Sequence, residues 1–569
     1  MSNQNSSDKL KLAFVNPPHA DWSLANNMTY LMCKSHYKHK GKYSDFVEWL
    51  PAPYKWNQYQ NYQEVYEEIK DADIILFSSY AWNYTINDDL CSYIKSKNPK
   101  IITAIGGPHI GTNELPLLLS RYSMYDYICQ PTKPGEVFVE DLIDSWFENY
   151  NLPIRENISW EINSEINKKY NLDMEEYSVY EDNFDYLKEM LDYAKSHNME
   201  PFIVIETTRG CPYRCVFCEW GGGIDTKIIK KDIEIVKRDI VALKKIGFRD
   251  AYLTDANFGA FEDRDIEIFE FAWKNNFNLT DISTMKSKDL NRRKRLIDKW
   301  FDVVGSINTK INSGQKDNMW EQTEYSSIVP TVSIQSISET AMKLADRVDL
   351  STKDKIELSR YINSRCAENS FPVPALELIL AMPGSTISDF YNEMEIIWNF
   401  QAWGSYRHDY MFLPDSRLNS IEYKEKYNIK TVEVYSDIVD EGGIDNWNSL
   451  YKDKKTYFRT IKSCFSFTSD EMKEMWFMNS ASNYLLKTSY NLFKNSMTPG
   501  EFAKNCYEII ITLPDFDPVF KEIDDLFDEN TSPKSIRRLQ NKFRVEAIEE
   551  LLIKNYIFIL NGVTTKCLI

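Results

Sequence analysis

The chain has 569 residues, of which 43% are apolar and 27% are charged, as in ordinary soluble proteins with a packed core. This length is enough for about three or four domains. The formal net charge is −18, and the sequence contains no long Lys/Arg block. This charge balance argues against nucleic acids and anionic membranes as partners.

The N-terminal sequence lacks an apolar signal core, and no run of about 20 apolar residues occurs in the chain. We therefore expect a cytoplasmic protein without a membrane anchor. In that compartment the ten cysteines are mostly reduced thiols. Seven of them are scattered along the chain, and we interpret these as small buried core residues.

Residues 1–150 alternate apolar runs with amphipathic stretches. Strands are predicted in "KLAFVNPP", "ADIILFSSYAW" and "KIITAIGGPH", and a helix in "NDDLCSYIKSK". This alternation predicts an α/β fold with a doubly wound, Rossmann-like parallel sheet. The charged stretch at 151–195 is predicted to be a helical linker.

Residues 196–420 show a second alternation, with six strand candidates separated by helical stretches. The candidates begin at Phe202, Ala251, Asp281, Thr331, Leu376 and Asp409. Six such units predict a partial (β/α)6 barrel, in which reactive residues gather at the carboxyl ends of the strands. Residues 421–569 are predicted to form a mainly helical C-terminal domain, most clearly at 469–493.

Three cysteines stand together in the sequence "GCPYRCVFCEWGGG". Cys211, Cys215 and Cys218 have the spacing C-x3-C-x2-C. Four thiolates complete the ligation of a 4Fe–4S cluster, so three leave one iron open to another ligand. The alternative is a structural zinc with a fourth ligand from elsewhere. The nearest histidine, His197, precedes the strand and is poorly placed for that role.

A C-x3-C-x2-C loop directly after the first strand of a β/α barrel resembles the radical S-adenosylmethionine (SAM) superfamily. The resemblance implies that the open iron chelates the amino and carboxylate groups of SAM. It also implies that an electron from the cluster cleaves SAM to a deoxyadenosyl radical, which abstracts hydrogen from an unactivated carbon. Phe217 occupies the position before the third cysteine, where the family usually has an aromatic residue.

The resemblance assigns further SAM-binding positions to the ends of later strands. In "TDANFG", Asp255 and Asn257 replace the family's usual Gly-Gly-Glu signature for the SAM amino group. In "SIQSISETAMKLADR" and "LELILAMPGST", it implies contacts to the SAM carboxylate, ribose and adenine from Gln335, Ser336, Arg347, Pro383 and Gly384.

An upstream doubly wound domain resembles that of the cobalamin-binding class of radical SAM enzymes. The turn containing Gly106, Gly107 and His109 is similar to the loop that lies against the corrin in that class. Gly135 and Glu136 resemble a degenerate form of its Gly-Glu-Gly-Glu helix start. A Gly-rich turn of this kind also occurs in nucleotide-binding proteins.

The Asp-x-His-x-x-Gly motif, whose histidine binds cobalt, is absent, and His19 does not have its spacing. The resemblance therefore implies cobalamin bound without a protein histidine ligand. In "SSYAWNY", Ser78 lies at the end of a predicted strand, and Trp82 is the candidate for covering the cobalt. Ordinary core packing is the alternative for Trp82.

The overall pattern resembles the cobalamin-dependent (class B) radical SAM methyltransferases of natural-product and antibiotic biosynthesis, including the carbapenem-type methylases. This implies methylation of an inert carbon through methylcobalamin and a deoxyadenosyl radical. It also implies a small-molecule or peptide-derived substrate and an electron donor such as flavodoxin or ferredoxin. We expect Arg407, His408 and Asp409 to lie near the substrate cavity, with a structural role as the alternative.

Three other functions are compatible with these residues. The same cofactors serve non-methylating rearrangements or cyclisations, and methylation also has a polar, non-radical route. A non-catalytic protein that binds a corrin or an iron–sulfur cluster is the third. The sequence does not identify the substrate.

Overall fold

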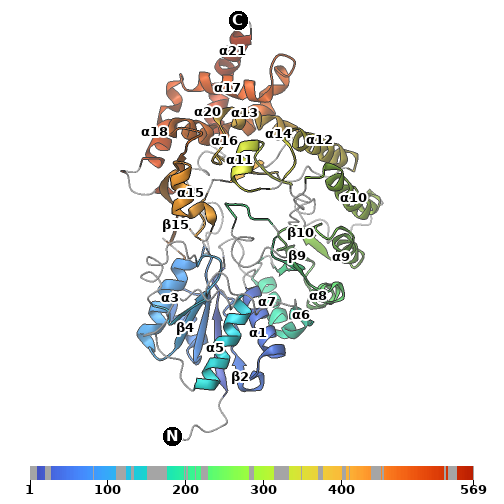
Figure 1. Cartoon of the computed structure of the whole chain (residues 1–569), viewed down its shortest axis with the longest axis vertical. Helices are drawn as coiled ribbons and strands as arrows, with labels where there is room; N and C mark the ends of the chain where they lie inside the picture. The colour runs from blue at the N-terminus through green and yellow to red at the C-terminus, as the bar shows by residue number, and fades with distance from the viewer. Residues whose placement is uncertain are drawn as a thin grey trace.

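The computed structural model describes residues 9–18, 27–80, 82–110, 124–129, 134–149, 176–197, 199, 203–211, 213–218, 228–280, 288–312, 332–347, 349–369, 376–399, 405–408, 411–414, 416–437, 450–451, 454–528, 530, 534–535 and 547–567. An N-terminal sheet lies at one end of the molecule and the C-terminal helices at the other, with β/α units between them (Figure 1). No helix in these ranges is both long and apolar enough to cross a membrane.

The N-terminal sheet has five parallel strands in the order β2-β1-β3-β4-β5. The strands are β1 (Leu10–Val15), β2 (Val47–Trp49), β3 (Ile74–Ser78), β4 (Ile102–Gly106) and β5 (Tyr127–Ile128). The strand order reverses between β1 and β3, and ligands of doubly wound sheets bind beyond the carboxyl ends of the strands near such a reversal. The predicted doubly wound arrangement is confirmed for the described residues.

Helices cover both faces of this sheet. They are α1 (Met28–Lys40), α2 (Tyr62–Ile69), α3 (Tyr84–Lys97) and α5 (Gly135–Asn149), with a short 3-10 turn, η2 (Ser44–Phe46). All five residues of β3 are buried. Two adjacent residues of this strand, Ile75 and Leu76, belong to two different apolar clusters, one on each face of the sheet. Burial on both faces explains why β3 is a continuous apolar run in the sequence. β2 and β5 were not predicted, because strands of three and two residues carry no pattern.

The predicted linker is a packed helical element where it is described. Helices α6 (Val179–Asp182) and α7 (Phe184–Ser196) follow each other directly. Leu187, Met190 and Leu191 of α7 are fully buried in the main apolar core. Residues 151–175 of the predicted linker lie outside the described ranges.

The middle of the chain forms two three-stranded parallel sheets, β10-β9-β6 and β11-β12-β13. The strands are β6 (Val204–Ile205), β9 (Asp250–Leu253), β10 (Asn278–Thr280), β11 (Val332–Gln335), β12 (Leu376–Ile379) and β13 (Ser405–His408). Between them lie α8 (Ile233–Ile246), α9 (Glu262–Lys274), α10 (Leu290–Asn312), α11 (Glu339–Leu344), α12 (Thr352–Glu368), α13 (Ile387–Asn392) and α14 (Met394–Asn399). Six parallel strands, in two separate three-stranded sheets, thus alternate with helices in the described part of the chain, and their closure into one partial barrel stays a prediction.

Two of the predicted strand starts, Asp281 and Asp409, lie outside the described residues. The described strands next to them, β10 and β13, are formed by less apolar residues that precede the predicted runs. A separate two-stranded antiparallel ladder, β7 (Thr208–Arg209) with β8 (Ile229–Lys230), encloses the cysteine loop.

The prediction of a helical C-terminal part was incomplete. Its helices are α15 (Ile421–Lys426), α16 (Ser469–Ser489), α17 (Pro499–Ile510), α18 (Asp517–Leu526), α20 (Ala547–Lys554) and α21 (Tyr556–Cys567), with the 3-10 turns η5 (Arg417–Asn419), η6 (Tyr490–Leu492) and η7 (Pro514–Phe516). A sheet, unforeseen in the sequence analysis, joins β14 (Lys430–Asp437) antiparallel to β15 (Lys455–Ser463) and parallel to β16 (Lys534–Ser535).

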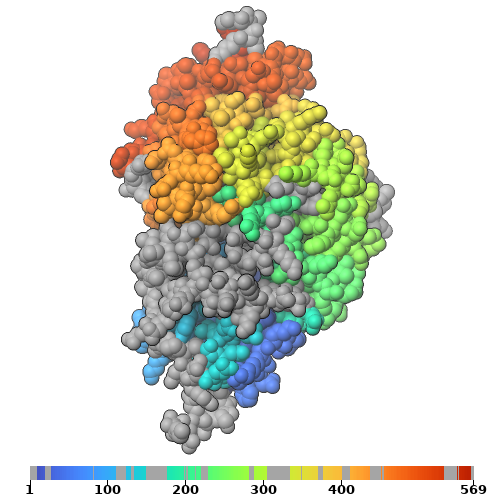
Figure 2. Space-filling view, viewed as in Figure 1, coloured from blue at the N-terminus to red at the C-terminus, as the bar shows by residue number. Residues whose placement is uncertain are grey.

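β15 and the residues before it reach back to the N-terminal sheet. The Tyr457 amide donates to the Tyr84 hydroxyl on α3 at 3.0 Å, and Lys454 binds Asp89 on the same helix. In the space-filling view the C-terminal part covers the far end of the molecule (Figure 2). The C-terminal sheet thus packs beside the carboxyl edge of the N-terminal sheet.

A substitution in the turn after β4 tests whether the backbone at this edge of the sheet requires glycine. Gly107 has φ +107°, and a Cβ there would lie 2.5 Å from the Ser79 carbonyl oxygen. We expect Gly107→Ala to destabilise the fold by at least about 1–3 kcal/mol, the usual cost of such a backbone conformation, and to lower the thermal unfolding midpoint. The matched control is Gly135→Ala, since a Cβ there meets nothing within 4 Å. Equal midpoints for the two variants would contradict this account of the turn.

Candidate functional site

The cysteine loop leaves the sheet through Gly210, which has φ +88°. Cys211 and Cys215 are buried, and Cys218 is half-buried. The Cys218 amide donates to the Cys215 carbonyl at 3.1 Å, so these two residues share one tight turn. In the described part of the chain, no three His, Cys, Asp or Glu side chains are grouped so as to hold a single metal ion.

Two distant segments hold the middle of the loop. The Val216 amide donates to the Ala345 carbonyl at 2.9 Å, and the Val216 carbonyl accepts from the Leu418 amide at 3.0 Å. The guanidinium of Arg417 binds the Arg214 carbonyl. The loop is thus fixed through its backbone to the turn after α11 and to η5. Phe217, the predicted aromatic residue, is half-buried against the main core.

Asp255 at the end of β9 fixes the start of the loop. Its Oδ1 accepts from the amides of Thr207 and Thr208 at 2.7 and 3.0 Å, and its Oδ2 accepts from their hydroxyls at 2.5 and 2.8 Å. Burial raises the pKa of Asp255 to about 6, against the lowering effect of these hydrogen bonds. The carboxylate therefore holds the backbone bend at Thr207 and Thr208, which leads into β7. The sequence analysis missed this role. Its predicted contact with SAM stays a prediction.

Asn257 reaches the cysteines directly. Its Nδ2 donates to the Cys211 sulfur at 2.9 Å. Its Oδ1 is buried and has no hydrogen-bond partner among the described residues. Buried amide oxygens are normally satisfied, so this acceptor, beside a predicted cluster ligand, fits a donor group of a bound molecule.

The end of β11 carries two of the predicted SAM residues. Gln335 has φ +65°, and the Ser336 hydroxyl donates to Oε1 of Glu393 at 2.8 Å. The same Glu393 oxygen accepts from the Ile337 amide at 3.2 Å. Glu393 thus organises the turn after β11, and nothing in its local sequence singled it out.

Arg347 belongs to a buried group of three cations around one carboxylate. Its Nε donates to Asp349 at 3.1 Å and its Nη2 to the Ser333 carbonyl at 2.5 Å. Arg293 binds the same carboxylate at 2.7 Å, and Lys355 lies 3.8 Å from it. Burial lowers the pKa of Lys355 to about 8. Arg347, Asp349 and Lys355 of this group border a cavity of about 450 Å³, whose lining also includes Lys288 and Lys343 and the carboxylates Glu339 and Asp346.

The turn at Pro383 and Gly384 packs closely on α11. Gly384 has φ +95°, and a Cβ there would lie 2.9 Å from a methyl carbon of Leu344. Its amide donates to the Ser466 hydroxyl at 2.9 Å. Glycine is therefore required by the backbone and by packing at this position, whether or not an adenine ring lies against it.

The predicted corrin residues gather at the carboxyl edge of the N-terminal sheet. Ser79 joins the two turns, because its amide donates to the Gly106 carbonyl at 2.7 Å and its carbonyl accepts from the His109 amide at 3.1 Å. The Ser79 hydroxyl is buried and without a partner in the described ranges. His109 stacks on Tyr84 with ring centroids 4.6 Å apart.

Ser78 and Trp82 lie on the same turn. Ser78 is buried, and its carbonyl accepts from the side-chain amides of Asn83 and Asn87 at 3.1 and 2.9 Å. Trp82 is half-buried and stacks on Tyr80 with ring centroids 4.5 Å apart. Trp82 is therefore held as part of a rigid turn at the sheet edge.

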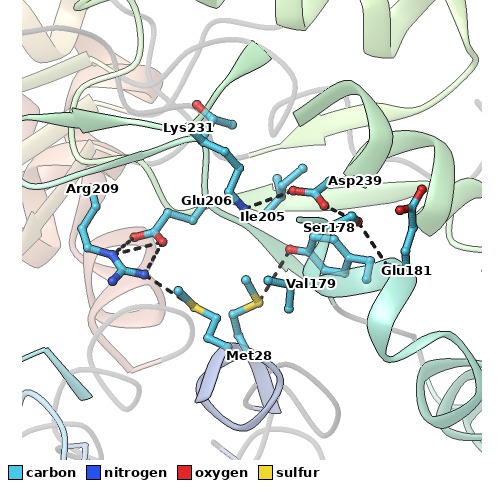
Figure 3. Close-up of polar contacts among 12 residues, drawn as sticks. Met28, Ser178, Val179, Glu181, Ile205, Glu206, Arg209, Lys231 and Asp239 are labelled. Atoms are coloured by element: carbon cyan, nitrogen blue, oxygen red, sulfur yellow. Dashed lines mark hydrogen bonds and ion pairs between the residues drawn. The ribbon is translucent and has the colours of Figure 1, made fainter. Parts of the chain in front are cut away.

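Glu136, predicted beside the corrin, contacts the other half of the molecule. It lies in the first turn of α5, and its Oε1 forms an ion pair with Nη1 of Arg209 at 2.9 Å. Gly135 has open space around it. Figure 3 shows the neighbourhood of Arg209, which also faces Glu206, and a second buried pair in which Lys231 points at Asp239.

The remaining candidates are outside the described side chains. Arg407 and His408 are in β13, whose side chains are not described, and His19 and Asp409 lie outside the described ranges. The sequence analysis also did not foresee Arg209, Thr207, Thr208 and Glu393. For Arg209, Thr207 and Thr208, the only available signal in the sequence was a polar residue close to the cysteine motif.

Curated relatives of this chain share the predicted chemistry. The chain is 22% identical over 383 residues to the cobalamin-dependent radical SAM methyltransferase TokK of Streptomyces tokunonensis, covering 65% of this chain and 51% of TokK. It is 26% identical over 211 residues to the 2-(S-pantetheinyl)-carbapenam-3-carboxylate methyltransferase of Streptantibioticus cattleyicolor, covering 36% of this chain and 30% of that protein. The chain thus matches about half the length of TokK and less of the second relative. No protein-family model matches the chain.

Solved structures share the fold. The radical SAM methyltransferase TsrM from Kitasatospora setae, with cobalamin and a [4Fe-4S] cluster bound, aligns with a TM-score of 0.55 at 13% identity, covering 91% of this chain and 98% of TsrM. The cobalamin-dependent SAM radical enzyme OxsB, with aqua-cobalamin and SAM bound, aligns with a TM-score of 0.56 at 13% identity, covering 98% of this chain and 81% of OxsB.

The resemblance to cobalamin-dependent radical SAM methyltransferases is confirmed. At these identities the solved structures establish the α/β fold with parallel sheets, while the roles of individual residues come from the geometry above.

The role of Asp255 is tested by Asp255→Asn. An asparagine keeps one acceptor oxygen for the amides of Thr207 and Thr208 but replaces the other oxygen with an NH2 donor, so the two buried hydroxyls lose their acceptor and two hydrogen bonds hold the bend in place of four, at a cost of about 1–3 kcal/mol. We expect amide hydrogen exchange at these residues to accelerate about tenfold or more.

The matched control is Asp232→Asn, because Asp232 caps α8 by accepting from the Glu234 amide, and asparagine caps helices equally well. Unchanged exchange at Thr207 and Thr208 in Asp255→Asn would show that the carboxylate does not hold the bend.

Proposed function

We propose that this chain is a cobalamin-dependent radical SAM enzyme that methylates an unactivated carbon of a natural-product intermediate. The observation that carries the proposal is the loop of three thiols at the mouth of the β/α units, next to a 2-1-3-4-5 sheet. The first feature is typical of radical SAM enzymes, and the second is a known ligand-binding sheet order. The named relatives support the combination.

The residues fit an iron–sulfur cluster with SAM. Cys211, Cys215 and Cys218 supply three thiolates, so a bound cube keeps one iron for SAM. Asn257 has a buried, unsatisfied Oδ1 beside Cys211, and we assign it the amino group in place of the absent Gly-Gly-Glu signature. The excess positive charge around Arg347 attracts the carboxylate.

Further contacts to SAM come from the two neighbouring turns. Gln335 and Ser336 lie at the end of β11 and are placed to bind the ribose, while Pro383 and Gly384 let backbone approach the adenine. Phe217 gives the loop an apolar wall. These assignments follow the family resemblance, and the fixed turns described above keep the residues in place.

The N-terminal domain, residues 1–150, fits cobalamin. Gly106 and Gly107 let the turn after β4 pack closely on Cys129 and Ser79 at the sheet edge, and Ser79 offers a buried hydroxyl there. Trp82 is our candidate for covering the cobalt and excluding a fifth ligand. When bound, the two cofactors supply a transferable methyl group and a hydrogen-abstracting radical, and the protein supplies their positions.

The remaining assignments complete the proposal. Residues 196–420 form the barrel, 151–195 the connecting helices and 421–569 the C-terminal domain that shapes the substrate cavity. The substrate is a small molecule or a peptide-derived one, and a flavodoxin or ferredoxin supplies electrons.

Cys215→Ala tests the proposal. We expect loss of the iron–sulfur absorbance and of deoxyadenosine release from SAM under a chemical reductant, because two thiolates do not hold the cluster. The control Cys366→Ala changes a buried cysteine of α12 and should keep both properties.

Anaerobic reconstitution, the optical spectrum and chromatographic detection of deoxyadenosine make the measurement. Full cleavage activity in Cys215→Ala would refute the cluster. Release of S-adenosylhomocysteine and methylated product without deoxyadenosine would indicate the polar route. Both cofactors bound with no SAM consumed would indicate a binding protein.

A further inference from the structure

Arg209 binds two carboxylates that belong to different parts of the fold. On one side, Nε donates to Oε1 of Glu206 at 3.0 Å and Nη2 donates to Oε2 of the same carboxylate at 2.7 Å, so this pair is bidentate (Figure 3). On its other side, Nη1 pairs with Glu136 of α5 at 2.9 Å. Arg209 lies two residues before Cys211, with only Gly210 between them. One planar group therefore connects the N-terminal sheet to the start of the cysteine loop.

Glu136 is connected to the edge of the N-terminal sheet that carries the predicted corrin residues. It stands in the first turn of α5, which follows β5, and β5 pairs with β4 through Ile105 and Ile128. The end of β4 carries Gly106. α5 is fixed in turn to α1, where the Tyr37 hydroxyl donates to Asp144 at 2.8 Å.

The contact is partly shielded from water. The side chains of Arg209 and Glu136 are 25% and 10% exposed, and the Met32 sulfur of α1 lies 3.8 Å from the guanidinium. Burial alone would raise the pKa of Glu136, but the Arg209 charge beside it holds that pKa below the usual value. Such a pair is stiffer than an exposed ion pair, and loss of one partner leaves a buried charge unpaired.

We infer that Arg209 is a positioning residue that sets the distance and orientation between the cysteine loop and the carboxyl edge of the N-terminal sheet. Glu206 orients the guanidinium, and Glu136 provides, at the stem of the cysteine loop, one of the contacts that cross between the two parts. The inference rests on the proposed function, because only a reaction shared by two cofactors requires a fixed distance and orientation between the loops that hold them. It also gives Glu136 a bridging role in place of corrin binding.

The inference predicts a specific defect. Without the bridge, each cofactor loop keeps its own contacts, so SAM cleavage at the cysteine loop continues. Methyl transfer depends on both loops and falls, because a displacement of about 1 Å can cost about 100-fold in rate. We expect the ratio of deoxyadenosine to methylated product to rise about tenfold or more.

The test compares Arg209→Met and Glu136→Gln with the wild-type protein and with Lys237→Met. Lys237 forms ion pairs with Glu234 and Glu267 at 2.8 Å on the surface of the β/α units, so its loss controls for removal of a cation. Hydrogen exchange of the apoprotein is expected to accelerate at 135–138 and 208–211 in both test variants, and in neither segment of the control.

In the cofactor-loaded protein, pulsed EPR between the reduced cluster and Co(II) reports the distance between the two cofactors. We expect a narrow distribution in the wild type and in Lys237→Met, and a broadened or shifted one in both test variants, with unchanged iron and cobalamin contents. The inference would be overturned if both variants showed the same hydrogen exchange and the same distances between the cofactors as the wild type. Loss of the cluster in both would also overturn it, by showing that Arg209 serves folding of the loop.

Failure of the proposed function gives a different result. If the wild type binds both cofactors but forms no methylated product, the distance distributions still decide the inference. If the wild type binds neither, the exchange measurement on the apoprotein decides whether the bridge exists.

Discussion

The arrangement of the site depends on the bend at Thr207 and Thr208, which a single buried carboxylate holds. Asp255 accepts four hydrogen bonds there, two of them from backbone amides that would otherwise be buried without a partner. This bend sets the direction in which the chain enters β7 and then the cysteine loop. A carboxylate from a neighbouring strand end thus holds the stem of the loop through its backbone, while Val216 and Phe217 pack the middle of the loop against the core.

From the bend outward, the loop is restrained by contacts far apart in the sequence. Its middle is bound by Ala345 and Leu418, its first cysteine by Asn257, and its stem by Glu136 through Arg209. Most of these contacts use backbone atoms or side chains other than the thiols. The protein can therefore hold the loop in place while keeping three sulfurs for a cofactor, and a preorganised loop is what a shared two-cofactor reaction requires.

The sequence predicted the parts of the structure that depend on local pattern. β3 was predicted because it is buried on both faces, and the cysteine loop was predicted because its spacing is specific. The β14–β15 ladder was missed because its pairing partners are 18 or more residues apart and their alternation is weak. Glu136 was recognised as a helix start, but its pairing with Arg209 depends on how two sheets come together, which no local pattern records. Asp255 was selected as a SAM-binding residue, which stays a prediction, while its hydrogen bonds show that it holds the backbone of Thr207 and Thr208.

The central claim is that three thiolates leave one iron open for SAM. The most direct measurement is Mössbauer spectroscopy of the ⁵⁷Fe-reconstituted protein with and without SAM. The account predicts four irons per chain in a cube, with the parameters of one iron changing when SAM is added and those of the other three preserved. A spectrum that SAM leaves unchanged, or a reconstituted protein that carries zinc in place of iron, would contradict it.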